Sequence, residues 1–119
     1  MIKYTEDHEW LDLNDDVATV GITNHAAEQL GDIIFIELPA EGDAVSEGDE
    51  IVVIESVKAA SDITAPLSGT IVEVNPSVVD DPASVNEDAM SAWFFKIKLD
   101  DVSVVDGLMD EDAYEAMIS

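Results

Sequence analysis

The sequence contains no cysteine and no arginine. Without cysteine, disulfide bridges, thiolate metal sites and cysteine nucleophiles are excluded, and any redox-active sulfur must come from outside the chain. Four lysines stand against 28 acidic residues, which gives a formal net charge of −24. Because Lys and Arg supply the attraction to phosphate groups, this balance argues against nucleic acid and anionic membranes as partners. It favours a monomer whose protein partners present basic surfaces, through an attraction that salt weakens.

Long hydrophobic runs are also missing. No stretch approaches the roughly 18 apolar residues that a membrane-spanning helix needs. The start "MIKYTEDHEW" has no h-region of a signal peptide and is too acidic for a transit sequence. We therefore expect a cytoplasmic protein of bacterial type, with the mitochondrial matrix as the alternative. The length predicts one domain over residues 1–119, with a sandwich core at about 1–100 and a helical segment at about 101–119.

Strand-like patterns dominate the chain. Apolar and polar residues alternate, and β-branched residues are frequent, in segments separated by turn sequences such as "LNDD", "PAEGD" and "PLSG". These segments are 9–13, 17–22, 32–38, 50–56, 69–75 and 93–99. A short helix is expected at "NHAAEQL", with Thr23 as its N-cap and Gly31 in the left-handed conformation after its end. Apolar residues at helical spacing after residue 101 predict two short C-terminal helices that close one end of the sheet.

The middle of the chain contains an internal repeat. The segment "GDIIFIEL", a linker and "AVSEGDEIVVIE" resembles "GTIVEVN", a linker and "SVNEDAMSAWFFKIK". The matched positions are Gly31 with Gly69, Ile33 with Ile71, Ile36 with Val74, Val45 with Val85, and 51–54 with 93–97. The repeat predicts two similar strand–turn–strand halves wrapped against each other in a quasi-symmetric β-sandwich.

The two halves are joined by "IVVIESVKAASDITAP", which is strand, a short break and strand again. The break contains no Gly, Pro, Asn or Asp, so we expect the flanking halves, rather than local turn chemistry, to fix its shape. Lys58 lies at its centre among small residues, and no other Lys or Arg lies between Lys3 and Lys96. An enzyme that meets this rigid, protruding end would find a single amine.

Several motifs together resemble the H protein of the glycine cleavage system. They are "DHEW" near the start, "GITNHAAEQLGDIIFIELP" in the middle, "ESVKAASDI" followed by "APLSG" and "VEVN", and "VNED" before the last strand. The similarity covers nearly the whole chain, from Tyr4 to about Ile118. It implies a mostly β barrel-sandwich hybrid of the lipoyl and biotinyl domain type, in which Lys58 carries lipoic acid in amide linkage.

The resemblance also implies a function, that of a carrier without enzymatic activity. Pyridoxal-phosphate glycine decarboxylase would load an aminomethyl group onto the lipoyl sulfur, the aminomethyltransferase would pass the one-carbon unit to tetrahydrofolate, and dihydrolipoamide dehydrogenase would restore the disulfide. A lipoate-attaching enzyme is the fourth expected partner. A five-membered dithiolane cannot reach the relaxed disulfide dihedral of about 90°, so its S–S bond opens readily. Such a group explains how a chain without cysteine can take part in redox chemistry.

Four further site residues follow from the resemblance. Glu9 of "DHEW" and Asp62 of "KAASD" are candidates for a cleft that holds the arm, where a carboxylate suits the loaded amine and exclusion of water protects it. Glu55 and Gly69 match the pattern associated with recognition by the lipoate-attaching enzyme. Gln29 stands where some members carry His, so a His contribution to arm binding is not expected. "DAMSAWFF" lacks the Gly usually found before its Trp, which affects only loop geometry.

The other signals have structural interpretations. "DLNDDV" begins like an EF-hand, but Val17 replaces the required Gly, so a hairpin turn is expected. His8 and His25 have no His partner nearby in sequence and are expected to be capping or packing residues. The aromatic residues are assigned to the core. They are Trp10, Phe35, Trp93, Phe94 and Phe95.

Alternative functions remain open. One is a lipoyl-relay protein that donates lipoate to other acceptors, and another is a lipoyl domain of a 2-oxoacid dehydrogenase, which the absence of a Pro/Ala-rich linker disfavours. A biotin carrier would place Met on both sides of the lysine, whereas Val57 and Ala59 stand here. The alternative from a different class is an unmodified β-sandwich interaction module, in which Lys58 is an ordinary surface residue.

Overall fold

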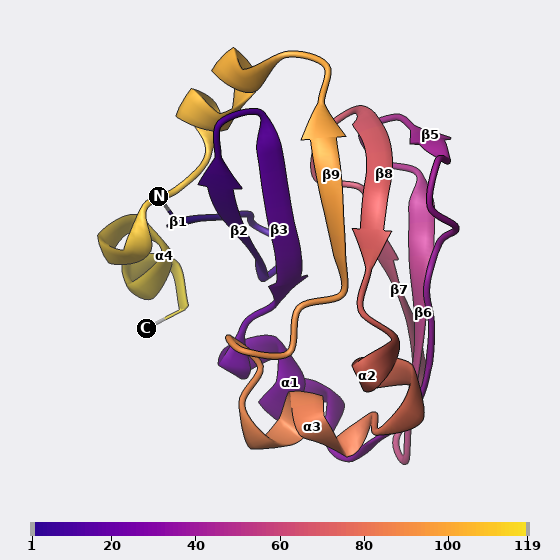
Figure 1. The fold of residues 1–119 in the computed structure, drawn as a ribbon. Helices are drawn as coiled ribbons and strands as arrows, with labels where there is room; N and C mark the ends of the chain where they lie inside the picture. The colour runs from indigo at the N-terminus through magenta and orange to yellow at the C-terminus, as the bar shows by residue number, and fades with distance from the viewer. Residues whose placement is uncertain (1, 119) are drawn as a thin grey trace.

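The computed structural model describes residues 2–118. The elements, in chain order, are β1 Ile2–Tyr4, β2 Glu9–Asn14, β3 Val17–Ile22, α1 Asn24–Leu30, β4 Ile33–Glu37, β5 Ala44–Val45, β6 Glu50–Ser56, β7 Ala60–Thr64, β8 Gly69–Val74, α2 Pro76–Asp80, α3 Ala83–Glu87, β9 Phe95–Leu99, the 3₁₀ helix η1 Val102–Gly107 and α4 Glu111–Ile118. A six-stranded sheet has the order β1-β2-β3-β9-β8-β5, and a three-stranded sheet has the order β4-β6-β7. The smaller sheet lies beside and behind β8 (Figure 1). Within residues 2–118, no helix is long and apolar enough to cross a membrane.

The mostly β prediction is confirmed, and the six expected strands correspond to β2, β3, β4, β6, β8 and β9. The sequence pattern does not predict β1 and β5, which are three and two residues long and have too few positions to show an alternation. It also does not predict α2 and α3, whose five residues each are too short to show a helical period. The one available signal is Asn75 followed by Pro76, an N-cap residue before a proline at the first helical position.

The two halves of the internal repeat have the same strand irregularity. In the pair β4·β6 the register shifts between Ile33 and Phe35, and in the pair β8·β9 it shifts between Ile71 and Glu73. The repeat matches Ile33 with Ile71, so both bulges fall at equivalent positions. Bulges increase local twist, and this pair bends each half in the same way. The quasi-symmetry expected from the sequence matches is therefore present in these strand pairs, but the match of Val45 with Val85 is wrong, because Val45 lies in strand β5 and Val85 in helix α3.

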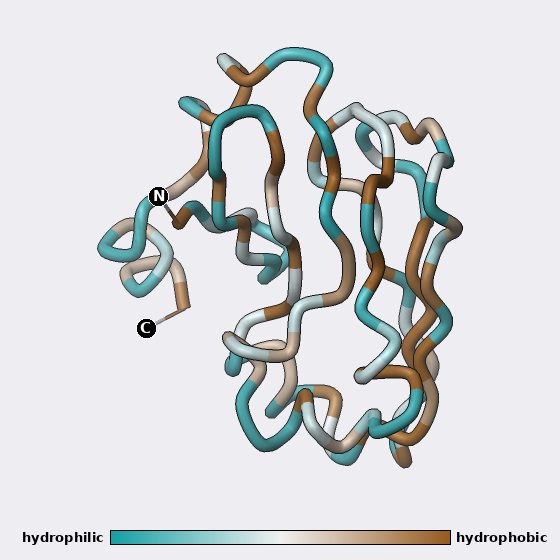
Figure 2. The backbone as a smooth tube through the Cα atoms, in the orientation of Figure 1, coloured by the Kyte–Doolittle hydropathy of each residue, from teal (hydrophilic) through white to brown (hydrophobic). Residues whose placement is uncertain are grey.

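The core is formed by alternate residues of both sheets. Ile36 and Ile54 of the smaller sheet belong to the same buried cluster as Val20, Ile71 and Ile97 of the larger sheet. The turn between β2 and β3 is hydrophilic, whereas β4 and β6 of the smaller sheet carry continuous hydrophobic stretches (Figure 2). Burial of this apolar surface is the main force that holds the sheets together.

The assignment of all five aromatic residues to the core is wrong for one of them. Trp10, Phe94 and Phe95 are buried and Trp93 is half-buried, but Phe35 is 43% exposed. The bulge that precedes Phe35 shifts its register against β6. A simple alternation along β4 therefore does not hold, and the next buried residue is Ile36.

Helix α1 begins where the sequence predicts. Thr23 is extended and its hydroxyl accepts a hydrogen bond from the backbone N–H of Ala26. The helix ends at Gly31, whose φ is 78° as expected, but whose ψ of −158° differs from the left-handed helical conformation. Essentially only glycine adopts this combination of φ and ψ. The prediction that Gly31 ends the helix is therefore confirmed, but the predicted left-handed helical conformation is wrong.

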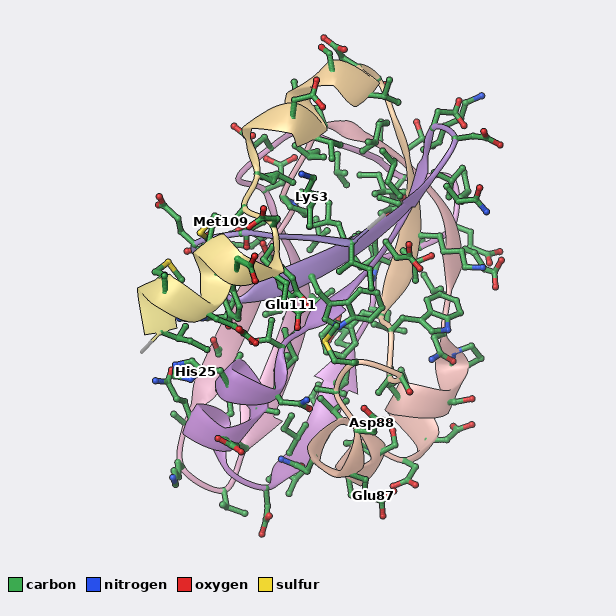
Figure 3. The ribbon with its side chains drawn as sticks, turned by 90° about the vertical axis from the view of Figure 1, so that its left-hand side faces the viewer. Lys3, His25, Glu87, Asp88, Met109 and Glu111 are labelled. Atoms are coloured by element: carbon green, nitrogen blue, oxygen red, sulfur yellow. The ribbon has the colours of Figure 1, made fainter. Side chains whose placement is uncertain are left out.

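The C-terminal segment packs against the edge strand β1. The backbones of Tyr4 and Met109 exchange two hydrogen bonds of 2.8 and 3.0 Å, and the ring of Tyr114 stacks on that of Tyr4 with centroids 4.7 Å apart. Figure 3 shows Met109 and Glu111 at the start of α4, beside the strand that carries Lys3. The two predicted C-terminal helices are confirmed as η1 and α4, although α4 covers an edge of the larger sheet instead of closing its end.

Candidate functional site

Lys58 lies at the tip of the hairpin between β6 and β7. This hairpin protrudes at the same end of the molecule as α1, α2 and α3 (Figure 1). The Ser56 hydroxyl accepts hydrogen bonds from the backbone N–H groups of Lys58 and Ala59 and donates one to the Ala59 carbonyl. From outside the hairpin, the Asp32 carbonyl accepts a hydrogen bond of 3.0 Å from the Val57 N–H. The expectation that only flanking structure shapes this break is wrong, because a buried serine also supplies local turn chemistry.

The Lys58 side chain is exposed and forms no ion pair with any residue in 2–118. Its aliphatic part lies along Gly31, where an added Cβ would be 3.1 Å from Lys58 Cε. The C-terminal helix α4 lies on the other side of the molecule, so it leaves the hairpin open (Figure 1). A visiting protein can therefore reach the amine directly.

A cavity of about 370 Å³ opens beside this hairpin. Its walls come from the loop before β2, from β3, from α1 and from β7; the lining residues are Asp7, His8, Glu9, Ile22, Ala26, Gln29, Leu30, Ser61, Asp62, Ile63 and Thr64. Glu9 and Asp62, which are far apart in the sequence, thus line the same hollow. Gln29, which stands where some family members carry His, also lines this cavity. Its volume lies within the range typical of small-molecule sites.

Glu9 is the buried acid of this cavity. Its side chain is 1% exposed, its Oε1 accepts a hydrogen bond of 3.1 Å from the Thr5 hydroxyl, and its Oε2 has no hydrogen-bond partner. Loss of hydration disfavours the charged form, so burial raises the pKa of Glu9 from 4.5 to about 8. The Thr5 hydrogen bond opposes this rise and nearby Asp7 adds to it. At neutral pH the carboxyl group is mostly protonated, and a cationic amine placed against Oε2 would favour its ionisation.

His8 belongs to a hydrogen-bond network that the sequence pattern does not reveal. Its Nδ1 lies 2.8 Å from the Tyr114 hydroxyl, which is also 2.7 Å from the Thr23 hydroxyl. The rings of His8 and His25 are 4.8 Å apart, although both residues lack a His neighbour in the sequence. Burial, and then the proximity of His25, lower the pKa of His8. The network joins α4 to the N-cap of α1 and to a wall of the cavity, in keeping with a packing role for His8. In the described part of the chain, no group of three or more potential ligands could hold a metal ion.

Tyr114→Phe should lower the free energy of unfolding by about 1–3 kcal/mol, because Thr23 and His8 each lose a hydrogen bond to the Tyr114 hydroxyl, although the Thr23 hydroxyl keeps the one it accepts from Ala26. Urea denaturation at pH 7 measures this change. Tyr4→Phe is the matched control, since Tyr4 keeps the same stacked ring but has no side-chain hydrogen bond in the described structure. Equal losses in the two variants would contradict the network.

Glu55 and Gly69 are not brought together by the fold. Glu55 is exposed on β6, three residues before Lys58, and pairs with Ala60 across the hairpin. Gly69 opens β8, at the end of the sheet away from the hairpin (Figure 1). It is buried between Val45 and Leu99, and a Cβ there would collide with the carbonyl oxygen of Lys98. The geometry thus favours a contact role for Glu55 and a packing role for Gly69.

Gly69→Ala should destabilise the protein by about 1–3 kcal/mol, because the backbones of β8 and β9 must separate to admit the methyl group. Thermal unfolding followed by circular dichroism measures the effect. Gly107→Ala is the control, since a Cβ at Gly107 meets nothing within 4 Å. An unchanged melting temperature for Gly69→Ala would show that the close approach is not restrictive.

An exposed lysine on a hairpin that joins two similar halves of a β-sandwich is the arrangement of lipoyl-type barrel-sandwich proteins, and the fold of this chain is of that class. The chain belongs to the glycine cleavage H-protein family, whose model matches residues 2–119. A curated relative, the glycine cleavage system H protein of Dinoroseobacter shibae, is 54% identical over 116 residues, covering 97% of this chain and 95% of the relative. The crystal structure of a glycine cleavage system H protein from Mycobacterium marinum superposes with a TM-score of 0.88 at 39% identity, covering 97% of this chain and 94% of that one. The chain therefore has a role in the glycine cleavage system, together with other components of that system.

Proposed function

We propose that this protein is the lipoyl-bearing carrier of glycine cleavage and that Lys58 is its attachment site. The observation that carries the proposal is the exposed amine of Lys58, which has no ion pair in the described structure and lies beside a cavity that contains the buried acid Glu9. Lipoate is the group that members of this family carry. When bound, it would supply a disulfide that accepts the aminomethyl unit of glycine and then hands it on.

The residues present fit this group. An arm of roughly eleven bonds from the Lys58 Cα to the dithiolane ring extends about 13 Å, at the advance per bond of an extended chain. Asp62 is the third residue of β7 and comes four residues after Lys58, so the two Cα atoms are at most about 13 Å apart at the rise of a strand. The cavity walls supply apolar contacts from Ile22, Leu30 and Ile63, which suit a hydrocarbon arm.

The chain's own residues divide the work between them. Ser56 holds the hairpin so that Lys58 projects, and Gly31 leaves room for its stem. Glu9 would accept a proton-bearing amine at Oε2, and Asp62 at the rim would add a second negative charge. The buried side of the cavity would exclude water from the loaded arm. The chain keeps the lipoyl arm attached to Lys58 and presents it in turn to glycine decarboxylase, the aminomethyltransferase and dihydrolipoamide dehydrogenase. These three enzymes perform the chemistry.

Intact-mass analysis of protein made in a lipoate-competent host tests the proposal. One lipoyl adduct, mapped to the peptide that contains Lys58, is expected. Protein without an adduct under these conditions would favour an unmodified interaction module. Glycine-dependent carbon dioxide exchange with the decarboxylase then separates a glycine-cleavage carrier, which supports exchange, from a protein that only relays lipoate. Fractionation of the source cells tests the expected cytoplasmic location.

A further inference from the structure

A second hollow, at the β4 edge of the smaller sheet, has an apolar lining. It measures about 410 Å³ and lies between β4, the segment that follows β4, and α2. We call it the β4–α2 groove; its lining residues are Phe35, Ile36, Glu37, Leu38, Pro39, Val74, Pro76, Val79 and Asp80. The acids Glu37 and Asp80 are exposed at its rim. The acids of this groove are exposed, whereas the cavity described above contains the buried acid Glu9.

The groove contains two large apolar side chains that are exposed to solvent, Phe35 and Val79. Phe35 is 43% and Val79 is 42% exposed, and Phe35 is the only exposed aromatic residue in 2–118. Ile34 and Val57, 60% and 64% exposed, are the most exposed large hydrophobic residues of the described chain. Ile34 and Val57 lie outside the groove lining, whereas Phe35 and Val79 belong to it. Two large exposed apolar side chains in one groove, on a chain with a net charge of −24, indicate an interaction surface.

The groove lies within reach of a protein that contacts Lys58. Phe35 pairs with Glu55 across β4 and β6, and Glu55 is three residues, or about 10 Å along a strand, from Lys58. An interface of standard size, about 800 Å² on each partner, is roughly 30 Å across. A partner centred on Lys58 is therefore large enough to extend to Phe35 at the groove.

We propose, on the basis of the function above, that the β4–α2 groove is a docking site for the lipoate-attaching enzyme. That enzyme would insert an apolar side chain, bordered by lysine or arginine, between Phe35 and Val79. It has to distinguish Lys58 from three other lysines before any arm exists, so it depends on the surface around the hairpin. The later enzymes can also hold the arm itself. A second copy of this chain is disfavoured as the occupant, because its own net charge of −24 would repel the acidic rim.

Steady-state lipoylation of the unmodified protein, with purified lipoate-attaching enzyme, lipoate and ATP, tests this assignment. Phe35→Ser and Val79→Ser should each raise the KM for the carrier about tenfold, the scale of one substantial interface residue, and leave kcat unchanged. Val104→Ser is the matched control, because Val104 is 45% exposed on η1 and lies outside the groove. Phe35→Leu should recover most of the loss. Higher salt should raise the KM of the wild type and of Phe35→Ser in parallel, since the rim acids remain.

The outcomes separate the docking site from the proposed function. Lipoylation of the wild type at Lys58, with KM values of both groove variants within twofold of it, would overturn the docking site alone. An increase in KM for the decarboxylase but not for the attaching enzyme would also overturn it, by assigning the groove to a different partner. A wild type that accepts no lipoate would overturn the proposed function instead. Circular dichroism of each variant confirms that it is folded, and Val79→Ser provides the test if Phe35→Ser is not.

Discussion

Lys58→Arg should abolish lipoylation and reduce glycine-dependent carbon dioxide exchange to the level seen without the protein. The guanidinium group stays protonated at all accessible pH values and cannot attack an activated acyl group, whereas the lysine amine can. The substitution keeps the positive charge and the length of the side chain. Because Lys58 is exposed and has no ion pair in the described structure, the free energy of unfolding should change by less than about 0.5 kcal/mol. The loss would then reflect chemistry at one amine and not the fold.

Lys98→Arg provides the control for that experiment. Lys98 is exposed on β9 and pairs loosely with Asp16 at 3.8 Å, so it offers an enzyme a second accessible amine. This variant should be lipoylated and support exchange as the wild type does. Intact mass and exchange of labelled bicarbonate into glycine measure both results. Residual exchange with Lys58→Arg would reject the attachment site, and loss of exchange with Lys98→Arg, which keeps the positive charge, would show that Lys58 is not the only amine that the reaction requires.

The sequence predicts the sheets of this fold well because its strands are long enough to display their pattern. Residues 17–22 and 50–56 are rich in β-branched residues, and both predicted ranges agree with β3 and β6. Thr23 likewise has a local mechanism, since its hydroxyl caps the N–H of Ala26. Features that depend on local hydrogen bonds and periodicity are therefore accessible from sequence.

The exceptions depend on contacts between distant parts of the chain. Nothing in the segment around Phe35 shows that a bulge will expose its ring. The meeting of His8 and Tyr114 joins residues 106 positions apart, so no local pattern contains it. Family resemblance predicts that Glu9 and Asp62 share one cleft, and the fold does line one cavity with both. The depth at which Glu9 is buried, which controls its ionisation, is a property of the packed structure alone.

Glu9→Gln should make the protein more resistant to unfolding at alkaline pH and remove a steep pH dependence. Burial raises the pKa of Glu9 to about 8, whereas in the unfolded chain it has its ordinary value of 4.5. Between these values the unfolded chain releases a proton that the folded protein retains, so the stability of the wild type falls as pH rises. The difference between these two pKa values limits the loss of stability to at most about 5 kcal/mol. This is a large part of the total free energy of unfolding, which is about 5–15 kcal/mol for a typical domain. The amide cannot ionise, so the variant avoids the loss.

Urea denaturation of both proteins from pH 4 to 9 at fixed ionic strength measures this effect. The many other acids titrate in both proteins, so the informative quantity is the difference between their free energies of unfolding. That difference should favour the variant increasingly from about pH 4.5 to about pH 8 and then level off. Glu6→Gln is the control, because Glu6 is an exposed acid three residues earlier and its substitution removes the same charge without changing the buried carboxyl group. A flat curve for Glu9→Gln would mean that the Glu9 carboxyl group is hydrated in the folded protein. That result would also contradict its proposed role as a buried group that receives the amine.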